Sequence, residues 1–556
     1  MVIHVVHWRI AGRTLAPLEL NEVMYTLELG IVTAGFLFMA VAVLATLIFG
    51  RFFCSWGCHI LALEDLAGWF LAKLRIRPRP IRSRLLRWVP LGAMLYMFVW
   101  PQVVRLIAGE PMPLLHVRSD AQGWASFVTD NFWGNLPGPG IAVSTFLVCG
   151  FLIVYMLGSR AFCTYACPYG ALFRIADRFA PGRIVARGDC SRCGKCTAAC
   201  QSHVLVHKEL VAYGRVVNPA CMKDLDCIAV CPEGRVGYAM AKPAILSLPV
   251  RNAVPRLAYD FSWTEELLIV VVFLASLFIF RGLYGIVPFL LTLAVGGILA
   301  YVAVLTLRLI HKPFLRLNNF QLKNRGRLTF TGGVFVTAST VLAGLTVHSA
   351  FIRYHEFLGD RLFARAQHTF ARTGAIPESS EVRDAIDHLE FAHSWGLLHR
   401  PEQIAKLADL HAGLGRSLAD EGRFEEALSH LQAVTTLRPA SAPDSYNLAV
   451  ILSAARLPEK AIAEYRRTTR LAPSDPDAHN NLGLLLASHG DSSMAMDHLR
   501  RAIQLRPDFA LPHFNLARIL LASGDRPQAI WHFKSAVSLD PSLAPVVRGL
   551  LEAGGG

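Results

Sequence analysis

The spacing of the cysteines constrains this chain more than any other feature of its sequence. Four of them follow C-x2-C-x2-C-x3-C, a spacing typical of bacterial iron–sulfur motifs, at Cys190, Cys193, Cys196 and Cys200. Three more continue on the same spacing, with Asp224 at the second ligand position: Cys221, Cys227 and Cys231. In such motifs three cysteines of one loop bind one cube, and the fourth reaches the other cube. The spacing therefore predicts two clusters, one bound by Cys190, Cys193, Cys196 and Cys231, the other by Cys200, Cys221, Asp224 and Cys227.

Zinc sites and disulfides explain this spacing less well. Zinc ribbons use C-x2-C pairs that lie far apart, whereas here four cysteines fall between residues 190 and 200. Disulfides need an oxidising compartment, and the charge pattern described below places this segment in the cytoplasm. Asp224 leaves three alternatives open for the second site: a weak carboxylate ligand in a 4Fe–4S cluster, an open corner in a 3Fe–4S cluster, or a degenerate site.

A second cysteine pattern occurs twice. Residues 51–58 and 160–167 both read Arg-x-Phe-Cys-x-aromatic-x-Cys, which indicates an internal duplication. Cysteines four residues apart lie on one helix face, so the two pairs are expected to gather at the cytoplasmic boundary of a membrane: Cys54, Cys58, Cys163 and Cys167. Metal binding or redox chemistry is favoured there over simple packing. Haem c attachment needs C-x-x-C-H, one residue shorter than Cys54 to His59, and the unpaired Cys149 fits a small apolar core residue.

Long apolar stretches predict a membrane protein. The hydrophobic fraction is 53% and the mean hydropathy is +0.39. Stretches of about 18 apolar residues mark membrane-helix candidates. Six segments reach or approach that length: 30–50, 88–104, 141–158, 267–280, 282–307 and 328–351. We therefore predict six spans, of which 267–280 is the shortest.

The charge distribution predicts how these spans are oriented. Residues 1–351 carry 33 Lys and Arg against 17 Asp and Glu, whereas the remainder carries 22 against 24. The excess lies in the loops 51–87 and 308–327, and the positive-inside rule places both loops and the segment 159–262 in the cytoplasm. Six spans then place the C-terminal tail in the periplasm, with the chain in a bacterial inner membrane. Membrane orientation accounts for the charge, and no groove-reading motif accompanies it, so no nucleic-acid partner is expected.

The C-terminal part repeats every 34 residues. Prolines keep this period at Pro439, Pro473, Pro507 and Pro541, and alanines keep it at Ala427, Ala461, Ala495 and Ala529. This is the tetratricopeptide period, with small residues where paired helices touch and proline after the second helix. Such solenoids bind through a concave face, so the tail is predicted to dock a protein partner. Its histidines are scattered and it has no cysteine, so no catalytic site is expected there.

With both cysteine patterns in view, the chain resembles the membrane-bound polyferredoxin family. That family includes the quinol-oxidising subunit of periplasmic nitrate reductase, the membrane electron donor and maturation factor of nitrous oxide reductase, and the copper-handling assembly factor of cytochrome oxidase. Its members share several spans, two Cys-x3-Cys-Pro motifs at the cytoplasmic membrane face and a double-cluster ferredoxin. Cys163 to Pro168 matches that motif fully, whereas His59 stands in place of the proline after Cys58.

The resemblance and the cysteines together imply an electron carrier rather than a self-contained enzyme. Electrons would pass between a cytoplasmic or quinone-pool donor and a periplasmic partner docked by the repeats, with quinone as a further candidate cofactor. The alternative is an assembly factor that reduces a metal for a periplasmic or membrane metalloenzyme.

The expected fold is a multi-span α-helical membrane protein with an inserted two-cluster ferredoxin-like α+β segment and a C-terminal all-α tetratricopeptide solenoid. The opening run 2–8 resembles the end of a hydrophobic helix that begins upstream, so 1–29 is expected to be an N-terminal segment with a truncated first helix. We expect membrane helices in 30–158 and 263–351, and a cytoplasmic loop in 159–262 with the cluster domain at about 181–243. A helical linker or capping repeat is expected in 352–404, and the repeats in 405–556.

Overall fold

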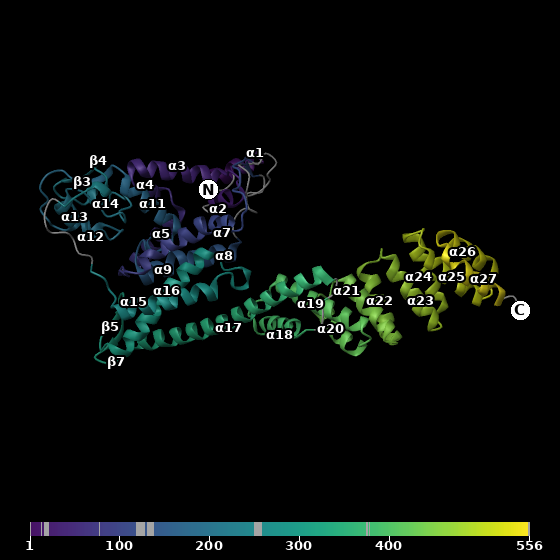
Figure 1. Ribbon diagram of the computed structural model, residues 1–556. Helices are drawn as coiled ribbons and strands as arrows, with labels where there is room; N and C mark the ends of the chain where they lie inside the picture. The colour runs from purple at the N-terminus through teal and green to yellow at the C-terminus, as the bar shows by residue number, and fades with distance from the viewer. Residues whose placement is uncertain are drawn as a thin grey trace. The chain divides into compact units, whose positions relative to one another are not determined.

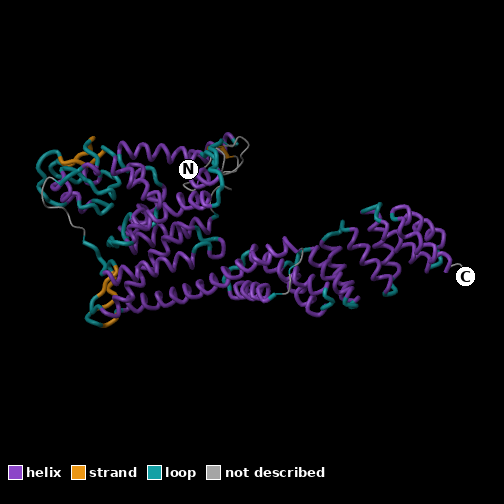
Figure 2. Tube along the Cα trace, in the orientation of Figure 1, coloured by secondary structure: helices purple, strands orange, loops and turns teal. Residues whose placement is uncertain are grey.

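The computed structural model describes residues 2–12, 14–15, 22–76, 78–117, 128–129, 138–249, 258–373, 376 and 379–553. Helices make up most of it, and the described residues form only three small sheets (Figures 1 and 2). The chain divides into two compact units, Met1–Ser349 and Ala350–Gly556.

The first unit contains the long apolar helices. Four helices are long and apolar enough to cross a membrane by length and composition: Leu86–Ile107, Trp263–Phe280, Phe289–His311 and Phe330–Arg372. Two shorter apolar helices are Ala34–Phe49 and Ala142–Leu157. All six lie over the six predicted stretches, and the membrane spans themselves stay a prediction.

The helices over the stretches 267–280 and 282–307 begin elsewhere than those stretches suggested. α15, Trp263–Phe280, starts four residues before the stretch 267–280, because Ser262 and Glu265 form a capping box at its N-terminus. α16, Phe289–His311, starts seven residues after the stretch 282–307 begins. The intervening residues turn at Gly282, whose φ is +67°, and Pro288 precedes the first turn of α16.

The helices of the first unit follow the chain in order. They are α1 (Val2–Ala11), α2 (Glu22–Leu29), α3 (Ala34–Phe49), α4 (Phe52–Trp56), α5 (His59–Lys73), α6 (Val89–Met94), α7 (Trp100–Ile107), α8 (Pro139–Thr145), α9 (Ile153–Leu157), α10 (Ala161–Tyr165) and α11 (Pro168–Phe179), then α15 and α16. π-helical turns join α6 to α7 and α8 to α9. One apolar core joins most of these helices, and it includes Leu61, Val154 and Ala294, each with 0% exposure.

A small α+β segment lies between α11 and α15. β3 (Gly182–Ala186) pairs with β4 (Val236–Met240) in antiparallel register, and α12 (Lys195–Ala199), α13 (Val206–Tyr213) and α14 (Asp226–Ala229) lie between them in sequence. The segment has its own core, in which Ile184, Val204 and Leu210 pack with several cysteines. Two further sheets pair β1 (Thr14–Leu15) with β2 (Val128–Thr129), and β5 (Leu315–Leu317) with β6 (Phe320–Asn324) and β7 (Arg327–Leu328).

The second unit is a stack of helix pairs (Figure 1). α17 (Phe330–Thr373) continues well past residue 351, and its last part packs with α18 (Ser380–Trp395) against α19. Four pairs follow, α19–α20, α21–α22, α23–α24 and α25–α26, and then α27: Pro401–Asp420, Phe424–Leu437, Ala442–Ala454, Pro458–Leu471, Pro476–Ser488, Ser492–Leu505, Ala510–Ala522, Arg526–Leu539 and Ala544–Ala553.

Small residues let the paired helices approach closely. A Cβ added at Gly483 of α23 would lie 2.8 Å from Cγ of Leu499 in α24. The four periodic alanines are all fully buried: Ala427, Ala461, Ala495 and Ala529. The 34-residue register thus places the smallest side chains at the tightest helix contacts.

Candidate metal centres

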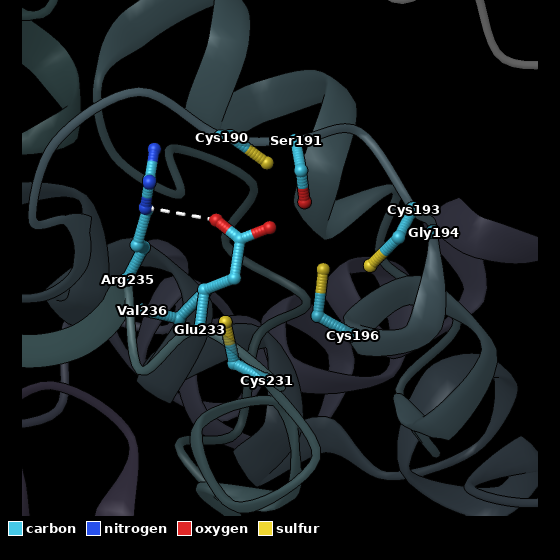
Figure 3. Close-up of a pocket in the computed structure, with 9 residues that line it drawn as sticks. All are labelled: Cys190, Ser191, Cys193, Gly194, Cys196, Cys231, Glu233, Arg235 and Val236. Atoms are coloured by element: carbon cyan, nitrogen blue, oxygen red, sulfur yellow. Dashed lines mark ion pairs between the residues drawn. The ribbon is translucent and has the colours of Figure 1, made fainter.

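The first cysteine loop, which joins β3 to α12, surrounds a hollow (Figure 3). Cys190 and Cys193 come from this loop and Cys196 from the first turn of α12, and their thiols face the hollow. Cys231, which follows α14, faces the same hollow from the far end of the segment. The loop turns sharply because Arg192 and Gly194 both adopt left-handed backbone conformations, with φ of +57° and +76°.

The second set of ligand candidates lies in the interior of the same segment. Cys200, Cys221 and Cys227 are 5–7% exposed and share one core with Cys196. Cys221 and Asp224 lie near enough to Cys200 to interact electrostatically with its thiol. Residues on both sides of Asp224 turn the loop, since Lys223 and Leu225 have φ of +59° and +67°. Four candidate donors, from the end of α12, the loop 221–224 and α14, therefore converge.

Asp224 differs from its surroundings in its hydrogen bonding. Its Oδ2 atom is buried and has no hydrogen-bond partner among the residues that the structure describes. Burial raises the pKa of this carboxyl above its usual value, although Arg160 acts in the opposite direction. A buried acceptor without a donor is costly, so this atom fits a metal or a protonated state.

No group of three or more His, Cys, Asp or Glu side chains in the described ranges is arranged to hold one metal ion. A cube holds each ligand on a different iron atom, so its ligands stand farther apart than those of one ion. Burial also raises the pKa of the Cys200 thiol to about 12, and a bound cationic centre would favour the thiolate instead.

The paired motifs place four more cysteines in the core of the first unit. Cys54, Cys163 and Cys167 are buried, and Cys58 packs against the same core while partly exposed. The Cys163 thiol interacts electrostatically with those of Cys54, Cys58 and Cys167. The expectation that the four cysteines gather is thus consistent with this packing, and their metal-binding role stays a prediction.

The expectation that each pair lies on one helix face is wrong. Cys54 lies in α4, but Cys58 is the N-cap residue of the next helix, α5. In the same way Cys163 lies in α10, and Cys167 caps α11 with its Sγ 3.4 Å from the backbone N–H of Gly170. Pro168 explains the second break, because proline starts a helix well but cannot continue one.

Buried charges surround these cysteines, and sequence reasoning missed most of them. Asp177 of α11 accepts from Arg183 (Oδ2 to Nη1, 2.9 Å), from Lys223 and from the backbone N–H of Arg51 (3.3 Å). The Arg51 guanidinium in turn lies 3.5 Å from Sγ of Cys54. Asp177 therefore ties the paired motif to the loop that carries Cys221 and Asp224.

Glu64 is a second buried acid beside the paired motifs. Its Oε1 accepts from the backbone N–H of Phe162 (3.0 Å), and its Oε2 has no hydrogen-bond partner in the described part of the chain. Burial raises the pKa of Glu64 to about 7, although the Phe162 N–H and Arg160 act to lower it. The only sequence signal for Glu64 is its place six residues after Cys58.

A cavity of about 610 Å³ lies between the two groups of cysteines. It is lined by residues next to Cys163, Cys200 and Cys221, among them Tyr165, His203 and Ala220. Basic and aromatic side chains complete its wall: Arg82, Arg87, Arg174, Arg178, Trp88 and Tyr259. Arg174 has an Nε atom without a hydrogen-bond partner among the described residues. The cavity has the size and the mixed lining of small-molecule sites.

Comparisons with known proteins bear directly on the paired motifs. A family model described as a 4Fe-4S binding domain matches residues 31–78 and 140–186, the two stretches that contain Cys54, Cys58, Cys163 and Cys167. Models described as tetratricopeptide repeats match residues 446–510, and 408–433 with 510–530. The chain is a polyferredoxin-family protein with C-terminal tetratricopeptide repeats. The predicted family and the predicted repeats are both confirmed.

Individual relatives match about a third of this polyferredoxin. It is 31% identical over 179 residues to the methylamine utilization ferredoxin-type protein MauN of Methylobacillus flagellatus, covering 32% of this chain and 54% of MauN. It is 26% identical over 217 residues to the putative electron transport protein YccM of Escherichia coli, covering 38% of this chain and 57% of YccM. The chain thus spans about half the length of these relatives. The crystal structure of MamA covers 30% of this chain and 92% of MamA, at 21% identity and a TM-score of 0.25.

Proposed function

We propose that this polyferredoxin is a membrane-bound iron–sulfur electron-transfer protein. The observation that carries the proposal is the crossed arrangement of cysteines: Cys231 faces the hollow of the first loop, and Cys200 lies with the second set. Iron–sulfur clusters supply one-electron transfer when bound. MauN is named as a ferredoxin-type protein and YccM as a putative electron transport protein, which supports the same function.

The ligand assignment follows from these two sets. We assign Cys190, Cys193, Cys196 and Cys231 to one 4Fe–4S cluster, and Cys200, Cys221 and Cys227 to a second. Asp224 takes the remaining corner, because its buried Oδ2 faces no donor among the described residues. Carboxylate oxygen is a poorer match than thiolate for iron of this type, so the second cluster is the more labile one.

Contacts among the basic loops support the proposed orientation. Asn319 donates to the Arg75 carbonyl (2.6 Å), and Asn318 accepts from the Arg79 N–H (2.9 Å). Arg84 donates to the Phe261 carbonyl at 2.7 Å. Three segments that charge counting assigns to the cytoplasm therefore meet at one end of the apolar helices. We propose that this end faces the cytoplasm of a bacterial inner membrane, and that the repeats lie in the periplasm.

The cavity between the cysteine groups is our candidate for a quinone site. Its aromatic residues suit an apolar ring, and Arg174 offers an Nε–H donor to a quinone carbonyl. Electrons would then pass between the quinone pool, or a cytoplasmic donor, and a periplasmic partner. Tetratricopeptide repeats commonly bind proteins, and we propose that this partner docks on them.

The buried paired cysteines favour one alternative function. The four thiols, of which those of Cys58 and Cys163 interact electrostatically with Glu64, offer soft ligands and a proton acceptor. This is the chemistry of an assembly factor that reduces or hands over a metal. In that case the proteins held by the repeats would be metalloenzymes awaiting their metal.

Redox-titrated EPR with iron and sulfide counting tests the proposal on full-length protein purified without oxygen. We expect iron and sulfide for two clusters, both reduced by dithionite and by a water-soluble quinol. Arg174→Gln should weaken reduction by the quinol and leave reduction by dithionite intact. Cys149→Ala serves as a control, because Cys149 is buried outside the two predicted cluster sets and should leave the iron content unchanged. Iron sufficient for one cluster or none would refute the proposal.

A further inference from the structure

The sequence positions of the repeat histidines suggested that they are scattered, but in the structure six of them form three pairs. Three pairs join the two helices of one repeat each, with Nδ1–Nδ1 distances of 2.9, 2.9 and 3.0 Å: His411–His430, His479–His498 and His513–His532. The ring planes meet at 38°, 32° and 41° in the same order. The same two-histidine geometry is therefore built three times.

The pairs follow the 34-residue register of the solenoid. Within each pair the residues are 19 apart, and successive pairs are one or two repeats apart. In the second repeat the same register positions hold Ser445 and Glu464 instead. The second repeat therefore lacks a histidine pair at this register, and it serves as an internal control for the other three repeats.

The first histidine of each pair is oriented by a hydrogen-bond acceptor on its far side. Nε2 of His411 lies 3.1 Å from Oε1 of Glu390, and Nε2 of His479 lies 3.3 Å from the Pro473 carbonyl. The Pro507 backbone is also hydrogen-bonded to the His513 ring. An oxygen that only accepts requires Nε2–H, so in the neutral ring Nδ1 carries the lone pair and accepts a hydrogen bond from the partner's Nδ1–H, whose proton a bound metal ion would replace. This orientation by carboxylate or carbonyl is typical of histidines that bind metals.

Burial differs between the two histidines of each pair. His411, His479 and His513 are 4%, 8% and 5% exposed, and their partners are half-buried.

The distance between the two nitrogens selects a metal geometry. With metal–nitrogen bonds of about 2.0–2.1 Å, nitrogens 2.9–3.0 Å apart subtend an angle of about 90° at the metal. Right angles belong to square-planar or tetragonal centres, which are typical of Cu²⁺ and Ni²⁺. We propose that each of the three histidine pairs binds one such divalent ion through its two Nδ1 atoms, with water or a partner protein completing the coordination.

Ni²⁺ uptake by the full-length protein tests this proposal. Protein purified without a polyhistidine tag is dialysed against Ni²⁺, and bound nickel is counted beside iron. Ni²⁺ also avoids the thiol oxidation that Cu²⁺ causes. His430→Gln/His498→Gln/His532→Gln should bind three fewer nickel ions than the wild type, with unchanged iron content. X-ray absorption should show imidazole ligands that disappear with the variant.

Two further variants separate the pairs from other histidines and from misfolding. His368→Gln/His489→Gln removes two exposed histidines outside the pairs and should bind as much nickel as the wild type. Ser445→His/Glu464→His should create a pair in the second repeat and add one ion. None of these variants changes His355 or His388, whose Nδ1 atoms lie 2.8 Å apart. Any nickel bound there would therefore add equally to every count.

Three results would overturn the proposal. They are equal uptake by the triple variant and the wild type, an equal loss in the His368/His489 control, and no additional ion in the Ser445/Glu464 variant. The iron count is a separate readout, so failure of this proposal is distinguishable from failure of the electron-transfer function.

Discussion

Asp177→Asn tests whether a buried charge network holds the second cysteine loop in place. Asp177, Arg183, Arg51 and Lys223 are at most 1% exposed. Oδ1 of Asp177 faces Lys223, and Oδ2 faces Arg183 at 2.9 Å. An asparagine of the same shape presents an oxygen to only one of these cations, and its NH₂ group opposes the other.

The expected cost follows from the missing acceptor. Removing one partner of a buried ion pair costs about 3–5 kcal/mol, because the remaining charge stays buried without compensation. Arg183 and Lys223 both depend on Asp177, so we expect the upper part of this range for the local unfolding free energy. Lys223 lies between Cys221 and Asp224, and its loop should open first.

The assay is iron release to a chelator, followed by EPR of the two clusters during denaturant titration. Asp177→Asn should release iron from the second cluster much faster than the wild type does, while the first cluster is affected less. Adding Lys223→Met to Asp177→Asn should recover part of the loss, since it removes the uncompensated cation.

Glu110→Gln is the control for this prediction. It breaks the exposed ion pair with Arg105, in which Glu110 is 64% exposed, and pairs of that kind contribute about 0–1 kcal/mol. The network does not support the loop if Asp177→Asn lowers the unfolding free energy no more than Glu110→Gln does. The same holds if the Asp177→Asn/Lys223→Met double variant loses as much stability as the two single variants lose together.

Four further predictions concern the clusters, the topology and the repeats. Cys231→Ala should damage the first cluster more than the second by EPR, and the opposite result would contradict the crossed ligation. Asp224→Cys should give a second cluster that resists oxygen better, and unchanged EPR and iron content would show that residue 224 is not a ligand. Reporter fusions after Arg84, Pro243 and Lys323 should be active only in the cytoplasm, and one after Gln403 only in the periplasm, so a cytoplasmic signal at Gln403 would refute the topology. Gly483→Leu should destabilise the repeats by about 1–3 kcal/mol in thermal unfolding, because its side chain would overlap Leu499, and a neutral effect would contradict the close helix contact.

Much of the architecture could be read from regularities along the chain. The 34-residue period predicts the helix pairs of the second unit because each repeat must bury its small residues against its own partner helix. The apolar stretches likewise predicted the positions of six apolar helices. Helix ends were less predictable. Local capping and turn residues such as Ser262 and Gly282 move them away from the limits of the apolar stretches.

The candidate metal centres were predictable only in part. The cysteine positions follow from spacing, but the break between the cysteines of each pair depends on where one helix stops and the next begins. Glu64 carried no pattern of its own in the sequence. The histidine pairs did carry one, a spacing of 19 residues within the 34-residue period, which a search for repeated histidines would have found.

The sequence by itself determined the types of ligand, the family and the repeat period, because each depends on residues near one another in the chain. Only the tertiary structure decided that Asp177 meets Lys223, 46 residues later, and that paired imidazoles face each other across two helices. Such contacts form only when the fold brings groups from separate elements within hydrogen-bonding distance of one another. Burial then sets their charge states, and burial is a property of the packed chain rather than of any one segment.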